Sequence, residues 1–339
     1  MFVCRAALGL LAMRKLQLLS ISFLMFCTTA GAAQLRQVAM IDMPGRPGFD
    51  ALAFAGQDLV IAHTAAGTLD IFDPAKRRLV AQIKGLDEPR GIAVDDQLGK
   101  VYVACAGSNS LAVISTADWT VSDTVELNDE PDFLLLTPLT GTLYIANWHA
   151  NSVSALNAKT HAIQTAELGG RPEELAHDPE HNLLYVTLQD RNEVVVLNPD
   201  LKTVRTFALR GSMPTGIAFD PKMRHLFVAV RSAVLVLNAD SGVEMSRIPT
   251  EEGVDTVWFD DSTRSAYAVS NNGVVTMISQ QNGRYAAEQE LNTVVRGHNV
   301  AFDPVRGLVY IPGGFEGRSK LVILKRIETP PATAKVSLK

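Results

Sequence analysis

One structural unit of about 42 residues recurs along this chain, and the repeat constrains the fold more than any other feature. Each copy contains a short apolar run, and most of these runs carry one aromatic residue. The clearest copy runs from Leu143 to Val153, with the letters LYIANWHANSV. The equivalent anchors are 42, 42, 41, 42, 40 and 43 residues apart, at Val60, Tyr102, Tyr144, Tyr185, Phe227, Tyr267 and Tyr310. Such regular spacing indicates a repeat architecture.

Each copy contains four short segments with the composition of β-strands. In the second copy these segments are 92–94, 100–104, 110–114 and 121–127. The first two segments of most copies are separated by Asp-Asp or Asp-Pro, as at Asp178-Pro179, and both residue types favour tight turns. Four antiparallel strands at this period are typical of a propeller blade. The sequence therefore predicts an all-β fold, a seven-bladed β-propeller of four-stranded antiparallel blades.

The two ends of the repeat array predict how the ring closes. The last copy supplies strand candidates at 299–302, 308–311 and 320–324 and then lacks a fourth. An unassigned strand candidate, 35–41, precedes the first copy. We expect this N-terminal strand to pair with 320–324 and complete the last blade, which would leave no gap between the first and last sheets.

Three repeated segments, Val101–Ala104, Leu143–Asn147 and Leu184–Thr187, resemble the YVTN β-propeller repeat family. Each is followed by a polar turn and an apolar strand, and the resemblance covers roughly residues 35–326. It implies a propeller in an exported or surface protein and says little about activity, because many members have no known activity. The position of Asn147, which keeps the family residue, varies in other copies: Cys105, Leu188, Val230, Ser270 and Gly313. We therefore expect the loops to differ from blade to blade.

The chain is expected to contain a signal peptide (1–33), one propeller domain (34–326) and a flexible tail (327–339). Arg14 and Lys15 precede the apolar run Leu16–Phe26, and small residues follow at 30–32. That run is too short to span a bilayer. We therefore expect a periplasmic or secreted protein without a transmembrane anchor. Either Met1 or Met13 fits as the start.

Loss of the leader would remove Arg5, Arg14 and Lys15 and change the net charge from −5 to −8. An acidic chain without a basic stripe is not expected to bind nucleic acid. Of the three cysteines only Cys105 would remain, so no internal disulfide could form. We expect a monomer that binds a protein or a small molecule at one face of the ring.

The expected binding face is the mouth of the central channel. The residue twelve positions before each anchor is expected to lie at this mouth, which gives one residue per blade. The shorter first copy gives Asp50, and the others give Arg90, Asp132, Glu173, Thr215, Asp255 and His298. Carboxylates from several blades suit Ca²⁺ or another divalent cation. Two interpretations stay open: solvated carboxylates opposed by nearby arginines, or a cation held by Asp50, Asp132, Glu173, Asp255 and Asn147.

A second hypothetical cluster consists of His63, Cys105 and His298. Histidine and thiolate together suit copper or zinc, whereas a lone cysteine at a strand end is commonly a small buried apolar residue. Exposed aromatic and arginine side chains are frequent in binding surfaces. The candidate contacts for a ligand or partner are Arg90, Trp148, His149, Arg191, Arg231 and His298, with packing of Trp148 over its own blade as an alternative.

The motifs of nucleophilic catalysis and of covalent haem attachment are missing from the sequence. We therefore expect an exported, non-enzymatic propeller that binds through its channel-mouth loops, without a required cofactor and without catalytic residues. The first alternative is a metal-dependent hydrolase or lyase with a divalent cation at the channel mouth, comparable to the gluconolactonase-like lactonases. The second alternative is a copper-binding redox accessory protein.

Overall fold

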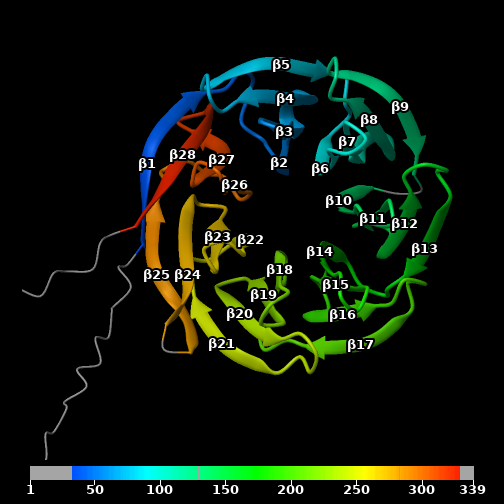
Figure 1. Ribbon diagram of the computed structural model, residues 1–339, viewed down its shortest axis with the longest axis vertical. Coiled ribbons are helices and arrows are strands. Elements are labelled where there is room, and N and C mark those ends of the chain that lie inside the picture. The colour runs from blue at the N-terminus through cyan, green and yellow to red at the C-terminus, as the bar shows by residue number, and fades with distance from the viewer. Residues whose placement is uncertain (1–32, 128–129, 282, 329–339) are drawn as a thin grey trace, which may run out of the picture.

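The computed structural model describes residues 33–127, 130–281 and 283–328. Seven four-stranded sheets surround one axis, which confirms the predicted seven-bladed β-propeller (Figure 1). The other secondary structure in these residues is two short 3₁₀ turns, η1 (Thr64–Ala66) and η2 (Ala106–Ser108). Residues 1–32 of the predicted signal peptide and residues 329–339 of the predicted tail lie outside the described residues, whereas Ala33, the last residue assigned to that peptide, is the first residue of a strand. In the described part of the chain, helices long and apolar enough to cross a membrane are absent.

The first four blades each contain four consecutive strands, numbered from the axis outward. Blade one has β2 (Leu52–Ala55), β3 (Asp58–His63), β4 (Thr68–Asp73) and β5 (Arg78–Lys84). Blade two has β6 (Pro89–Asp95), β7 (Lys100–Cys105), β8 (Ser110–Ser115) and β9 (Thr120–Glu126). Blade three has β10 (Pro131–Thr137), β11 (Thr142–Asn147), β12 (Ser152–Asn157) and β13 (Ile163–Glu167). Blade four has β14 (Pro172–Asp178), β15 (Leu183–Leu188), β16 (Glu193–Leu197) and β17 (Thr203–Ala208).

The next two blades repeat this order and the last one does not. Blade five has β18 (Ile217–Asp220), β19 (His225–Val230), β20 (Ala233–Asn238) and β21 (Glu244–Pro249). Blade six has β22 (Val254–Asp260), β23 (Ser265–Ser270), β24 (Val274–Gln281) and β25 (Arg284–Asn292). Blade seven has β26 (Ala301–Asp303), β27 (Leu308–Phe315) and β28 (Arg318–Glu328), with β1 (Ala33–Asp42) outermost.

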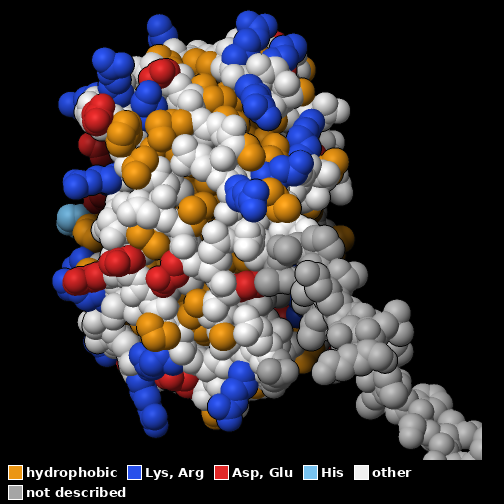
Figure 2. Space-filling model, turned by 90° about the vertical axis from the view of Figure 1, so that its left-hand side faces the viewer, with side chains coloured by type: hydrophobic (Ala, Val, Ile, Leu, Met, Phe, Trp, Pro, Cys, Tyr) orange, Lys and Arg blue, Asp and Glu red, His pale blue; other side chains and the backbone are white. Residues whose placement is uncertain are grey.

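Blade seven joins the two ends of the described chain, as predicted. Strand β1 pairs with β28 in antiparallel register, from Leu35 opposite Arg326 to Ile41 opposite Leu321. Figure 1 shows the blue N-terminal strand beside the red C-terminal one. Strand β28 continues to Glu328, beyond the expected domain end at residue 326. The side of the ring that carries β1 shows acidic, basic and apolar side chains interspersed (Figure 2).

The repeated anchors form the contacts between blades. The side chains of Tyr102, Tyr185, Tyr267 and Tyr310 are at most 1% exposed. The Tyr267 ring, for example, stacks on Phe302 of the next blade with centroids 5.7 Å apart. Burial of one large apolar side chain per interface stabilises each contact by roughly 1.5–3 kcal/mol. The ring is therefore held together by the residues that make the repeat visible.

The predicted turn aspartates also have a structural role. Asp178 is fully buried, and its Oδ1 accepts from the backbone N–H groups of Glu180 and His181. Its other oxygen lies 2.9 Å from Arg224 Nη2 of blade five. These carboxylates shape the turn and link neighbouring blades.

The pairing of four innermost strands is irregular where these strands begin, at the mouth of the central channel. Register shifts lie at Pro89/Ile92, Pro131/Phe133, Pro172/Leu175 and Val254/Thr256, next to four of the predicted channel-mouth residues. A β-bulge changes the direction of the side chain at the extra residue. Gly216 lets two inner strands approach closely, since its N–H donates to Asp255 O at 2.7 Å and a Cβ there would lie 2.6 Å from Val257 N. The bulges thus direct polar side chains toward the axis.

Candidate active site

The structure brings six of the seven predicted channel-mouth positions around one cavity of about 90 Å³. Each of these residues comes just before its blade's innermost strand or lies at the start of it, so the fold delivers one side chain per blade. The cavity is lined by Asp50, Asp132, Glu173, Thr215, Asp255 and His298, together with Ala51, Gly91, Phe133, Glu174 and Asn299. The seventh position, Arg90, reaches the ring through Asp132, with Nη1 lying 2.8 Å from Asp132 Oδ1.

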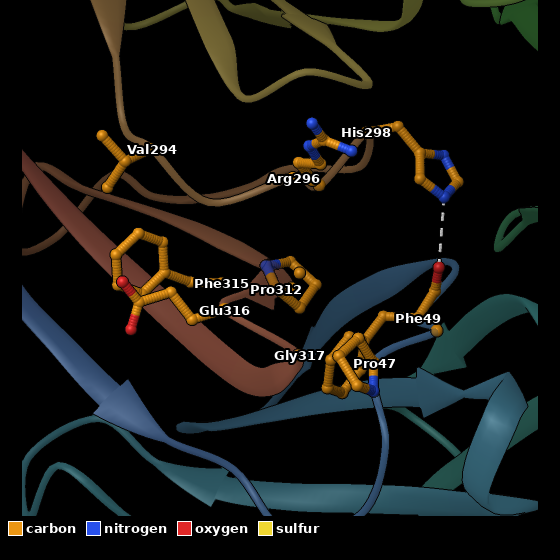
Figure 3. A pocket seen from close by; sticks show the side chains of 13 residues that line it. Pro47, Phe49, Val294, Arg296, His298, Pro312, Phe315, Glu316 and Gly317 are labelled. Carbon is orange, nitrogen blue, oxygen red and sulfur yellow. Dashed lines mark hydrogen bonds between the residues drawn. The ribbon is translucent and has the colours of Figure 1, made fainter.

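His298 is held at this cavity by acceptors from two other blades. Its Nδ1 lies 2.7 Å from Asp255 Oδ2 of blade six. Its Nε2 lies 3.1 Å from the carbonyl oxygen of Phe49, which precedes blade one (Figure 3). A carbonyl and a carboxylate only accept, so this arrangement favours the ring with protons on both nitrogens.

The electrostatics of His298 agree with this geometry. Burial lowers its pKa, but the hydrogen bond and charge of Asp255, together with the charge of Asp50, outweigh burial and raise the pKa to about 9. The His298 and Asp255 side chains are 35% and 39% exposed, so water weakens their attraction. His298 is thus a cation near neutral pH, within reach of solvent and of a ligand.

Asp50 and Asp132 are carboxyl groups whose pKa values are raised above the ordinary value. Burial and the charge of Asp132 raise the pKa of Asp50 to about 6, although His298 and Arg90 oppose the rise. Burial also raises the pKa of Asp132, although its hydrogen bond to Arg90 opposes the rise. One amide nitrogen, Asn299 Nδ2, lies 3.2 Å from Asp50 Oδ1 and 3.4 Å from His298 Nδ1. Asp50 and His298 therefore face the same small space.

Glu173 connects the cavity to Trp148. Trp148 Nε1 donates to Glu173 Oε1 at 2.8 Å, and the Arg171 guanidinium lies over the Trp148 ring, 4.4 Å from its centroid. Burial raises the pKa of Glu173 to about 8 even though the indole hydrogen bond opposes the rise. Trp148 therefore contacts the cavity wall of the next blade and does not merely cover its own blade.

Glu174 is a cavity residue that the sequence did not indicate. The bulge between Pro172 and Leu175 turns both Glu173 and Glu174 toward the axis. Glu174 and Asn299 also line a deeper, mostly apolar cavity of about 360 Å³ between the innermost strands. Burial raises the pKa of Glu174 to about 8. The only sequence signal was its position directly after a predicted ring residue.

The remaining candidate contacts lie around the mouth. Arg90 Nη2 lies 2.9 Å from Glu130, whose other oxygen lies 2.9 Å from Nδ1 of the exposed His149. Arg231 pairs with Glu252 at 2.6 Å. Arg191 is exposed after β15, and its side chain is packed beside Gly170. These residues form an outer rim and not the cavity wall.

Two larger pockets flank the central cavity and share residues with it. One, of about 520 Å³, contains Phe49 and His298 and is bordered by Pro47, Pro312 and Phe315 (Figure 3). The other, of about 470 Å³, contains Thr215 and Asp255 together with Arg231 and Glu252. A ligand of several hundred Å³ can therefore lie across the mouth and reach His298.

The residues at the mouth do not fit a metal centre. Among the described residues, no group of three or more His, Cys, Asp and Glu side chains is arranged to hold a metal ion. The ring carboxylates have other partners: Arg90 for Asp132, Trp148 for Glu173, His298 for Asp255 and Asn299 for Asp50. A cation at the mouth would have to displace these partners.

The other three predicted metal ligands lie away from the cavity. Asn147 is buried within its own blade, where Nδ2 donates to Ser152 and Ser154 at 3.1 and 2.8 Å. Cys105 is a buried free thiol whose Sγ lies 3.8 Å from Val103 O, and burial raises its pKa. His63 is buried against Asp70. The structure does not bring His63, Cys105 and His298 together as one cluster.

Comparisons with known proteins find solved structures that share this fold. No family model and no curated protein matches this sequence, so the resemblance to the YVTN-repeat family rests on the motif residues alone. Selenomethionine-substituted virginiamycin B lyase from Staphylococcus aureus is 13% identical, with a TM-score of 0.72 over 87% of this chain and 100% of that one. A streptogramin B lyase structure is 13% identical, with a TM-score of 0.70 over 87% and 98%. A catalytically inactive histidine-to-alanine variant of the S. aureus enzyme with quinupristin is 12% identical, with a TM-score of 0.72 over 87% and 100%.

At these identities the likeness shows the fold, and it corrects one expectation. We expected a non-enzymatic binding platform, but these proteins, which share the fold over nearly their whole length, are lyases. The expectation of a non-enzymatic protein was wrong because the sequence contains no compact catalytic motif. Each repeat supplies about one acidic or basic residue to the cavity, and these residues come together only in the folded ring. Several groups with displaced pKa values in one cavity are typical of active sites.

Proposed function

We propose that this protein is a lyase, an enzyme that breaks a bond by removing a proton from one atom while a leaving group departs from its neighbour. One observation carries the proposal: Asp50 and His298 face the same cavity with pKa values of about 6 and about 9. Two titratable groups whose environments separate their pKa values in this way are suited to be a base and an acid.

Asp50 acts as the base and His298 as the acid. Above about pH 6 Asp50 is ionised and can accept a proton from carbon. Below about pH 9 His298 is protonated and can give a proton to the leaving group. Positioned acid–base groups of this kind contribute roughly 10²–10⁴-fold to a rate. Both groups are in the required state across the neutral range.

Asp255 and the Phe49 carbonyl keep His298 in the acid form. The carboxylate of Asp255 stabilises the charge of the imidazolium, and the carbonyl fixes the second ring nitrogen. When a substrate binds, one of these contacts exchanges for the leaving group, since hydrogen bonds at empty active sites often rearrange on binding. Asn299 Nδ2 donates to Asp50 Oδ1 at 3.2 Å and so helps to orient the base.

The substrate is larger than the central cavity. The cavity of about 90 Å³ has room only for the reacting atoms, whereas the flanking pockets of about 520 and 470 Å³ can hold the groups on either side. The solved lyases with this fold support the same reaction class, and one of them loses activity when a histidine is replaced by alanine. At 13% identity or less, they do not identify the substrate of this chain.

Turnover of cyclic and open-chain esters and amides, followed by mass spectrometry, tests the proposal, with quinupristin as the first compound. Elimination creates a carbon–carbon double bond and adds no water, so a cyclic substrate opens without a change in mass. A product that has gained one water would contradict the lyase and support the hydrolase alternative. The His298→Ala variant should be inactive, whereas His161→Ala, at a partly exposed turn in blade three, should retain activity.

A further inference from the structure

His63 is a fully buried histidine whose ring is fixed at both nitrogens. Its Nδ1 lies 2.9 Å from Asp70 Oδ2, and its Nε2 lies 2.9 Å from the carbonyl oxygen of Arg46. Because a carbonyl only accepts, Nε2 is the donor in the second contact. The ring therefore connects blade one to the loop that carries Arg46.

Asp70 is itself held in place by its own blade. Its second oxygen accepts from Thr68 Oγ1 at 2.7 Å and from Gln82 Nε2 at 2.8 Å. His63, Asp70 and Gln82 lie on three successive strands, β3, β4 and β5. The orientation of the imidazole is thus set by a hydrogen-bond network that is buried at His63, Thr68 and Asp70.

Residues 43–50 form the loop that crosses from blade seven to blade one, and this loop rests on His63. The Phe49 ring stacks on the imidazole, with centroids 4.0 Å apart and planes at 29°. Ala65 N donates to Gly48 O at 3.0 Å, and Arg46 Nε donates to Ala65 O at 3.1 Å. Only glycine fits at position 48, where φ is +146° and a Cβ would lie 2.4 Å from Ala65 Cβ.

The same loop supplies one side of the proposed active site. The carbonyl oxygen of Phe49 accepts from His298 Nε2, and the next residue in the chain is Asp50 (Figure 3). Direct contacts therefore run from Asp70 through His63 and Phe49 to His298. They cross the junction at which the ring closes.

We infer that His63 is a positioning residue, which fixes residues 43–50 so that the Phe49 carbonyl meets His298 and Asp50 faces the cavity. The inference rests on the proposed function only in taking His298 and Asp50 as the reacting groups. It also gives His63 a role other than the metal ligand suggested by the sequence. His63 itself does not reach the cavity, since Phe49 and Arg46 cover its ring.

The test is an NMR titration of the His298 ring in full-length, histidine-labelled protein, without any substrate. His63→Phe keeps an aromatic ring against Phe49 but loses both hydrogen bonds. We expect the loop to shift, the contact from Phe49 O to His298 to weaken, and the pKa of His298 to fall by about one unit. The matched control is His225→Phe, another buried histidine, at the opposite end of its second strand in blade five, which should leave the titration unchanged.

A second variant keeps the inference falsifiable if His63→Phe does not fold. Phe49→Leu retains the backbone carbonyl and an apolar side chain in its buried cluster but loses the aromatic stacking on His63, so the pKa of His298 should fall in the same direction by less. An unchanged His298 titration in a folded His63→Phe protein, or in Phe49→Leu if only that variant folds, overturns the inference. Because the readout needs no turnover, loss of the proposed lyase activity and loss of this coupling are observed separately.

Discussion

Glu174 and Thr256 form a hydrogen bond between blades that are not neighbours: Glu174 Oε1 of blade four lies 2.9 Å from Thr256 Oγ1 of blade six. The other oxygen of Glu174 accepts from Ile217 N of blade five at 3.1 Å. One carboxyl group in the wall of the candidate active site therefore joins three blades. The protonation of this group should affect the stability of the whole ring.

We predict that the protein becomes less stable as the pH rises from 5 to 9. Burial raises the pKa of Glu174 and Glu173 to about 8, and Asp50 and His298 are also raised. A folded state that holds protons more tightly than the unfolded chain loses stability as the pH rises through the folded pKa values. Burial lowers the pKa of His225, so this group alone makes the protein more stable as the pH rises. One such group does not outweigh the four groups whose pKa values are raised. Thermal melts across this range measure the trend.

Glu174→Gln should remove part of this pH dependence. The amide oxygen can accept from Ile217 N and the amide N–H₂ can donate to Thr256 Oγ1, with no charge to bury. We expect the melting temperature to rise by about 2 °C at pH 9 and to change little at pH 5. Glu180→Gln, at a carboxylate that is 72% exposed, is the control. If Glu174→Gln changed the melting temperature equally at pH 5 and pH 9, ionisation of Glu174 would not be what destabilises the folded protein at high pH.

The strand that closes the ring provides another prediction. Leu35 of β1 is 1% exposed and packs in the cluster that contains Tyr267 and Leu324, and its N–H donates to Gln289 Oε1 at 2.6 Å. Leu35→Ala should lower the free energy of unfolding by about 2–5 kcal/mol, because it leaves a cavity at the closure. Val38→Ala, in the same strand but 39% exposed, should cost much less. Similar denaturation midpoints for the two variants would contradict a structural role for β1.

Divalent cations should not change the stability of this protein. The channel-mouth carboxylates are already partnered by Arg90, Trp148, His298 and Asn299, and a cation would have to displace these groups. We expect the same melting temperature after dialysis against EDTA and after addition of Ca²⁺. A ligand present at one hundred times its dissociation constant stabilises by about 2.7 kcal/mol. A clear rise in melting temperature with Ca²⁺ would therefore restore the cation interpretation.

The fold was predictable from the sequence because every blade needs the same contacts. An anchor such as Tyr102 or Tyr267 packs against the adjacent blade, so its position recurs with the repeat. The unmatched strands at the two ends, β1 and β28, predicted the closure for the same reason. Because the same contact between blades recurs in every repeat, the spacing of the anchors was sufficient to predict the architecture.

The position of the residues around the candidate site was predictable, but their contacts were not. Counting back from the anchors placed Asp132 and Asp255 at the mouth, since each blade delivers one residue there. Glu174 was missed because a bulge breaks the regular alternation of side chains along its strand. The Phe49 carbonyl was missed because it is a backbone group, and a pattern of residue types does not predict the contacts of a backbone group. Asn147 failed as a ligand because its strand end turns the amide into the sheet, toward Ser152 and Ser154.

The pH dependence of turnover is the sharpest prediction about the mechanism. With Asp50 as the base and His298 as the acid, activity should rise through about pH 6 and fall through about pH 9. Asp255→Asn removes the carboxylate that keeps His298 protonated, so the pKa of His298 should fall and the alkaline limb should move toward neutral pH. At pH 8 we expect turnover to fall at least about ten-fold, with a smaller loss at pH 6.5. The measurement is kcat against pH for both proteins, with Glu180→Gln, at a carboxylate that is 72% exposed and away from these pockets, as the control. An alkaline limb that stays in place in Asp255→Asn would show that His298 is not the acid.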